Sequence, residues 1–195
     1  MDNKNKIALY IEKISNEKNI SLEDIPQIDL YMDQVIQLFE NKYGNTKRNA
    51  EEKILTKTMI NNYAKGKLIF PIKNKKYSKE HLIMISFIYQ MKGALSIKDI
   101  HDTLNGINNK MGDGQFPLEA FYDSYLQLNE KNKMTFMEDV QEKKNDVMKQ
   151  LQEEDKELTD DLEKIMLITS LASVSNMYRR AAEALVDDLK DKENK

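Results

Sequence analysis

The sequence predicts a mostly all-α protein that carries one small β-hairpin in its first half. Apolar residues make up 40% of the 195 positions, which is enough to build the core of one large or two small domains. Residues that interrupt helices are scarce, with six glycines and three prolines. None of them follows Pro117, and Leu, Met, Ala, Glu and Lys fill that stretch. We therefore expect the region 117–195 to be helical throughout.

Composition also narrows the class of protein. Cysteine is absent, which excludes disulfides, thiolate metal sites and thiol nucleophiles and fits a reducing compartment. The polar start Met1–Lys6 is not followed by the apolar run of a signal peptide. The longest uncharged stretch, Ile165–Tyr178, contains several hydroxyl and amide side chains and is too short to span a bilayer. We expect a cytoplasmic protein that makes no membrane contact.

The first half contains several helix signals. A short helix is expected around Ile7–Ile14, within an N-terminal extension that covers 1–26. A second helix, Gln27–Tyr43, has apolar residues at helical spacing and Pro26 at its start. Thr56 stands at an N-cap position before a helix of two to three turns, Lys57–Lys65, which Gly66 closes.

A β-hairpin should follow that short helix. Leu68–Ile72 is an extended apolar run, and the turn-prone Lys73–Lys76 comes next, followed by Tyr77. Two more helices complete the region: Ser78 caps one that runs through Lys92, and Ser96 opens another that runs through Leu104, with Asp99 completing a capping box. The polar, glycine-containing stretch 108–116 is expected to be a linker.

Charge is unevenly distributed although the net charge is only -3. Eight lysines and no acid lie between Lys53 and Lys79, whereas sixteen acids face ten bases between Glu138 and Lys195. A basic segment of this kind fits a nucleic-acid surface, and a solvated face is the alternative interpretation.

The helix Lys57–Lys65 carries the functional prediction. Met59, Ile60 and Tyr63 share one side, and the opposite side carries lysines and amides but no acid. Lysines neutralise phosphates, and asparagine can bond the edge of adenine, so this side suits a recognition helix; the alternative is that the asparagines merely face solvent. The candidate DNA-contacting residues are Thr56, Lys57, Thr58, Asn61, Asn62 and Lys65 on the helix, with Lys73, Lys75 and Lys76 on the hairpin.

At these residues a family resemblance appears. Four segments resemble the MerR pattern of recognition helix, wing, third helix and the segment that follows it. They are Leu55–Tyr63, Leu68–Pro71, Lys75–Leu82 and Lys92–Ile100. The stretch from Ile25 to about Tyr125 resembles more closely an uncharacterised bacterial family, domain of unknown function 1836. The resemblance implies a winged helix-turn-helix over 27–107 and a role in transcription. It implies no ligand or target.

The sequence departs from the MerR pattern at several positions. Asn61 stands where MerR proteins usually have a phosphate-binding Arg, Lys67 replaces a usual Gly, and Lys75 replaces the wing Arg. The ten residues 45–54 also lengthen the turn between the two helices.

Sites for chemistry are not expected. The metal sites of MerR relatives do not transfer, because no cysteine is present. The two histidines, His81 and His101, show no metal-binding spacing, and the carboxylate runs are typical of solvated helix faces. We predict that the chain is not an enzyme and has no catalytic residue, metal or cofactor.

The C-terminal module 117–195 is expected to hold three helices: from Pro117 to about Lys131, from Thr135 to Glu157, and a last one capped by Thr159. Apolar residues of the last helix recur at heptad-like steps, and the helix is apolar nearly all round from Ile165 to Val174. We expect this surface to form a homodimer interface or to line an effector pocket, through Leu167, Leu171, Val174, Tyr178, Ala181 and Leu185.

Together these observations predict a dimeric transcriptional regulator that binds double-stranded DNA. A small-molecule effector is left open. The alternative is a protein-interaction adaptor that has the winged-helix fold but does not bind DNA.

Overall fold

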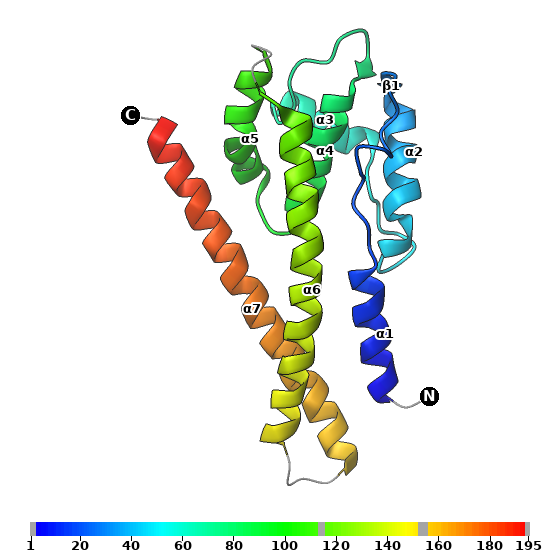
Figure 1. The fold of residues 1–195 in the computed structure, drawn as a ribbon, viewed down its shortest axis with the longest axis vertical. Coiled ribbons are helices and arrows are strands. Elements are labelled where there is room, and N and C mark those ends of the chain that lie inside the picture. The colour runs from blue at the N-terminus through cyan, green and yellow to red at the C-terminus, as the bar shows by residue number, and fades with distance from the viewer. Residues whose placement is uncertain (1–2, 113–115, 152–155, 194–195) are drawn as a thin grey trace. The chain divides into compact units, whose positions relative to one another are not determined.

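The computed structural model describes residues 3–112, 116–151 and 156–193 (Figure 1). Those parts are mainly helical and include one two-stranded sheet. No helix among them is both long enough and apolar enough to cross a membrane. The elements are α1 Asn3–Ser15, β1 Leu30–Tyr31, α2 Met32–Tyr43, the 3-10 turn η1 Gly44–Thr46, α3 Lys57–Lys65, β2 Lys76–Tyr77, α4 Lys79–Met91, α5 Ile97–Gly112, α6 Leu118–Gln150 and α7 Lys156–Glu193.

The chain divides into two compact units. The first, called the helical unit, contains α1, the part of α6 from Leu128 onward and α7 as far as Ala184. The second, called the sheet unit, contains Glu17–Gln127 and the end of α7 from Leu185. The two long helices α6 and α7 therefore each contribute to both units.

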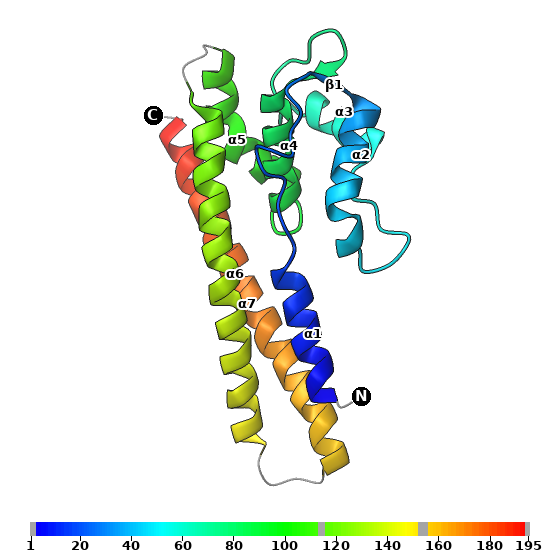
Figure 2. The same ribbon diagram turned by 45° about the vertical axis from the view of Figure 1, so that its right-hand side comes forward.

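The sheet unit is built around α4 (Figure 2). Eight consecutive residues of α4, His81 to Ile88, are buried, as expected for a helix covered on all sides. The packing side chains come from α2, α3, α5 and the start of α6. They include Val35, Phe39, Ile60, Tyr63, Ile100, Leu104, Leu118 and Tyr122. This core fixes the position of α3.

The sheet differs from the predicted hairpin. β2 pairs antiparallel with β1, in the register Leu30↔Tyr77 and Tyr31↔Lys76. The expected hairpin partner, Leu68–Ile72, is not a strand, and only the bridge Lys73↔Lys76 closes the turn. Because Leu30 and Tyr31 are used in the sheet, α2 begins at Met32, and the prediction of a helix from Gln27 is wrong.

Several predicted helix boundaries also need correction. The N-terminal helix α1 is confirmed but extends beyond Ile7–Ile14. Helix α5 continues past Leu104 to Gly112, so the predicted linker is helical for 108–112, while 113–115 lie outside the described residues. The expected break after Lys131 is absent, and α6 is a single helix because no Gly or Pro interrupts it. Helix α7 begins at Lys156, so Thr159 does not cap it.

In the helical unit, α6 and α7 supply the buried side chains Val140, Val147 and Leu167. The side chains Asn132, Thr135, Phe136 and Asp139 of α6 and Tyr178 of α7 line a shared hollow of about 330 Å³, which shows that the helices are neighbours. Not every apolar residue of α6 joins this packing, since Met137 is 42% exposed.

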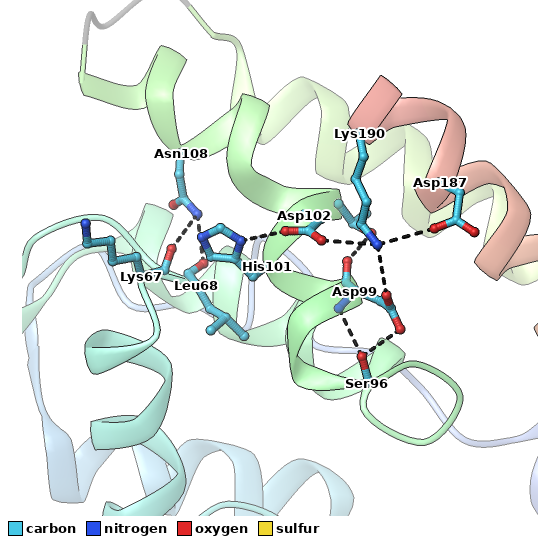
Figure 3. Close-up of polar contacts among 10 residues, drawn as sticks. Lys67, Leu68, Ser96, Asp99, His101, Asp102, Asn108, Asp187 and Lys190 are labelled. Carbon is cyan, nitrogen blue, oxygen red and sulfur yellow. Dashed lines mark hydrogen bonds and ion pairs between the residues drawn. The ribbon is translucent and has the colours of Figure 1, made fainter. Parts of the chain in front are cut away.

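The end of α7 is fastened to α5 within the sheet unit (Figure 3). The Lys190 ammonium lies 3.3 Å from Asp99 Oδ1, 3.2 Å from Asp102 Oδ2 and 3.3 Å from Asp187 Oδ1. On the same helix α5, Asn108 Nδ2 donates to the Leu68 carbonyl at 2.9 Å, in the segment that leaves α3. Helix α5 thus contacts both the end of α7 and the chain that follows α3.

Candidate nucleic-acid interface

Helix α3 has a buried side and an exposed side, as its sequence predicts. Thr56 caps the helix, and its Oγ1 accepts from the Met59 N–H at 3.1 Å. Ile60 and Tyr63 are 0% and 4% exposed. The opposite side carries the exposed residues Lys57, Thr58, Asn61, Asn62 and Lys65.

The end of α3 turns through a lysine in the left-handed region. Lys67 has φ 56°, the Leu68 N–H donates to the Tyr63 carbonyl at 2.9 Å, and the Lys67 N–H donates to the Ala64 carbonyl at 3.2 Å. These two bonds form a Schellman motif, whose left-handed position is usually glycine. Gly66 sits one residue earlier, where a Cβ would lie 2.7 Å from Leu68 Cδ1, so close packing accounts for that glycine.

The turn before β2 is also left-handed. The Lys76 N–H donates to the Lys73 carbonyl at 3.0 Å, and Asn74 and Lys75 have φ 52° and 58°. Two central residues with positive φ define a type I′ turn, in which glycine is favoured at the second position. Lys75 occupies that position and is exposed, as is Lys73.

Replacing Lys75 with glycine is expected to stabilise the protein. Relief of the left-handed conformation outweighs the entropy that glycine adds to the unfolded chain, for a net gain of about 0.5–1 kcal/mol. Lys73→Gly is the matched control, because Lys73 has no positive φ and glycine there should destabilise by a similar amount. Urea unfolding of both variants measures the difference, and an equal loss of stability in both would contradict it.

A hollow of about 490 Å³ lies between α3, the turn before β2 and the start of α2, next to both strands. Asn61 of α3 and Lys75 of the turn both line it, so two of the predicted DNA-contacting residues are brought together. Tyr31 of β1 contributes, as do Met32 and Asp33 at the start of α2, and Ile72 and Tyr77 complete the lining.

Two contacts beside this hollow did not follow from the sequence. Asp33 Oδ1 lies 2.8 Å from the Lys57 ammonium, and both side chains are largely exposed. The Lys76 ammonium lies 5.3 Å from the centre of the Tyr31 ring, and Lys76 is half-buried rather than free at the tip. No local signal around Lys57 indicates Asp33, because the two residues come together through the packing of α2 on α3.

His81 joins α4 to the chain that precedes the turn. Its Nδ1 accepts from the Ser78 N–H at 3.1 Å, so Nε2 carries the proton and donates to the Phe70 carbonyl at 3.3 Å. The ring also packs on Phe70, with centroids 3.9 Å apart. Burial lowers the pKa of His81, against the opposing effect of the Phe70 carbonyl and of Glu80.

Acid should therefore destabilise the fold through His81. Because its folded pKa lies below 6.5, the unfolded chain takes up a proton first as pH falls through that value, and stability is lost. One proton changes the free energy of unfolding by at most about 1.4 kcal/mol per pH unit. Urea midpoints between about pH 7.5 and 5.5 should show a fall that His81→Gln reduces. An unchanged pH dependence in His81→Gln would argue against this role.

The predicted C-terminal interface residues do not form one exposed surface. Leu167 is 6% exposed, and Leu171 and Val174 are half-buried. Tyr178 and Leu185 are 72% and 67% exposed, and Ala181 is exposed as well. The first three residues belong to the packing of the helical unit.

Within the described residues, no group of three His, Asp or Glu side chains is placed to hold a metal ion. Comparison of the chain with curated proteins and with solved structures finds no match. A family model does match, over residues 20–125, which is more than half of the chain and includes α2 to α5, both strands and Tyr122. The chain therefore belongs to the family described as domain of unknown function 1836.

Proposed function

We propose that the chain is a DNA-binding transcriptional regulator with a MerR-like winged helix-turn-helix. Helix α3 enters the major groove, and the turn 73–76 acts as the wing against the phosphate backbone. The observation that carries this proposal is the hollow lined by both Asn61 and Lys75, since it sets the amide side of α3 beside the cationic turn.

The charges of this surface support the proposal. Exposed lysines at the two ends of α3 and in the turn are suited to phosphates, and the exposed amides between them are suited to base edges. Every non-glycine residue with positive φ in the described chain lies beside this surface: Lys67, Asn74 and Lys75. Strained backbone of this kind concentrates at functional sites.

Selection of bound sequences from a random duplex library tests the proposal. We expect a preferred site, and labelled duplexes of that site should then bind in dilute buffer. Asn61→Ala should relax the base preference at one position, whereas Lys65→Gln should weaken all sequences alike. A protein that ignores every duplex at low salt would refute the assignment.

A second candidate function is the protein-interaction adaptor, and Asp33 is the observation that favours it. A carboxylate in the hollow disfavours phosphate and pairs with Lys57, which is otherwise free to bind DNA. Such an acid is compatible with a protein partner.

The variant Asp33→Asn separates the two functions. If DNA binds here, loss of the carboxylate removes a repulsion and frees Lys57, so duplex affinity should rise about two- to fivefold. Asp123→Asn, which removes an exposed acid on α6, is the matched control and should change nothing. Fluorescence anisotropy at fixed salt makes the comparison, and equal affinity of the two variants would favour the adaptor.

We propose further that the regulator acts as a homodimer, because a two-fold protein matches palindromic half-sites. No catalytic group, metal or cofactor is part of the proposal. An effector pocket remains the alternative role of the C-terminal helices.

A further inference from the structure

Helix α7 carries a second line of residues that the described residues of the chain leave exposed. It consists of Asp161, Ile165, Ile168, Ala172, Ser175 and Arg179, and is called here the outer seam. The steps between these residues are alternately four and three, the spacing of a helix that packs lengthwise on another helix. All six residues are exposed, with Ile165 at 60% and Ile168 at 65%.

The outer seam differs from the seam that the helical unit uses. Leu167, Leu171 and Val174 lie on another side of α7 and are buried or half-buried. Two isoleucines lie one turn apart on the exposed side, and no part of the chain that the structure describes covers their apolar surface.

When the outer seam is read in the reverse direction, each residue meets a residue of complementary charge or size. The six residues form three pairs, and the members of each pair lie equally far along the sequence on either side of Ser170. The pairs are Asp161 with Arg179, Ile165 with Ser175, and Ile168 with Ala172. In a two-fold contact, residue i of one copy meets residue j of the other and the reverse holds too. An antiparallel second copy centred on Ser170 thus sets each isoleucine against a small residue and each Asp161 against Arg179 of the second copy.

The charges on the outer seam favour antiparallel packing of the two copies over parallel packing. A parallel copy would place Asp161 opposite Asp161 and Arg179 opposite Arg179, which is repulsive. The present partners of these groups are neighbours on α7: Asp161 pairs with Lys164 at 3.1 Å, and Arg179 pairs with Glu183 at 2.5 Å. Exposed pairs of this kind contribute little, so exchanging them for a contact between copies costs little.

We propose that a second copy of the chain docks antiparallel on the outer seam, centred on Ser170. The proposal rests on the homodimer part of the proposed function and specifies its geometry, and it replaces the interface expected at Leu167, Leu171 and Val174. It does not depend on DNA binding.

The mass of the full-length protein in solution is the first test. Light scattering or sedimentation equilibrium should give twice 22.8 kDa at high concentration. Arg179→Asp turns two attractive pairs per dimer into repulsive ones, so the dissociation constant should rise roughly tenfold or more. Arg180→Asp changes the same charge at the next residue, off the seam, and should dimerise like the parent.

Exchanging the two charged residues of the outer seam then distinguishes a loss of the contact between copies from a loss of folding. The double variant Asp161→Arg with Arg179→Asp restores opposite charges across the contact and should recover the parent dissociation constant. Circular dichroism of each variant reports whether α7 stays helical. If Arg179→Asp and Arg180→Asp weaken the dimer equally, or if the double variant is not rescued, the outer seam is not the interface.

Disulfide cross-linking tests whether the two copies of α7 are antiparallel. Because the chain contains no cysteine, each introduced cysteine is the only thiol of its copy. Ile165→Cys protein mixed with Ser175→Cys protein should form a disulfide between copies, while each variant alone should not. Cross-linking of each variant with itself would indicate a parallel contact and overturn the proposal. A monomer at every concentration would also overturn it, whether or not the protein binds duplexes. A dimer that ignores DNA would refute only the regulator assignment.

Discussion

Replacing Lys57, Lys65, Lys73 and Lys75 together with glutamine is expected to weaken duplex binding on the order of a thousandfold near 0.1 M salt. Each lysine that neutralises a phosphate releases about one counterion, so four of them should lower the slope of log affinity against log salt by about four. These four side chains are exposed, and glutamine preserves their bulk. Titration of a labelled duplex at several salt concentrations measures both quantities.

A matched variant controls for total charge. Lys98, Lys110, Lys131 and Lys149 are also exposed but lie on α5 and α6. Their replacement with glutamine changes the net charge equally and should leave most of the affinity and the slope in place. If the two quadruple variants lose affinity to the same degree, binding depends on overall charge, and the surface formed by α3 and the turn is not the interface.

Tyr122→Ala is expected to cause the largest loss of stability that we predict, about 3–5 kcal/mol. The ring is 1% exposed and packs on Phe87, with centroids 5.2 Å apart. Its hydroxyl donates to the Ile20 carbonyl at 2.6 Å, and burial raises its pKa. This one side chain therefore joins α6 to the segment that leads into α2.

Two further variants separate the contribution of the Tyr122 hydroxyl from that of its ring, and the effect of this ring from that of a neighbouring one. Tyr122→Phe keeps the ring but leaves the Ile20 carbonyl without its donor, which should cost about 1–2 kcal/mol. Phe121→Ala removes a neighbouring ring that is 45% exposed and should cost clearly less than Tyr122→Ala. Urea unfolding compares all three, and a loss for Phe121→Ala as large as for Tyr122→Ala would contradict the assigned packing.

Local signals were enough to predict α3 and its two sides. Thr56 and Gly66 mark the ends, and the spacing of Ile60 and Tyr63 marks the buried side, so all of this information lies within eleven residues. The start of α4 at Ser78 and the turn at Asn74 could likewise be predicted from residues that are close together in the sequence.

Long-range pairing could not be predicted in the same way. Leu30 and Tyr31 continue the apolar pattern of α2, and only their pairing with β2 shows that they form a strand. Asp33 meets Lys57 through the packing of α2 on α3, which is also a long-range contact, so the acid in the candidate site had no sequence signal near α3.

The last helix shows a related limit. Its sequence is apolar on more than one side, and periodicity alone does not say which side the chain itself covers. The structure covers the side of Leu167 and leaves that of Ile165 and Ile168 exposed.

The three contacts of Lys190 bear on how far the matched family region can stand alone. A polypeptide that stops where the family match stops, at Tyr125, loses the cation that neutralises Asp99 and Asp102 on α5. Those two carboxylates are one turn apart on α5, the helix that also holds the Leu68 carbonyl, and they would then repel each other. Shortened versions of this protein should therefore retain the final turns of α7, even when the dimer is of no interest.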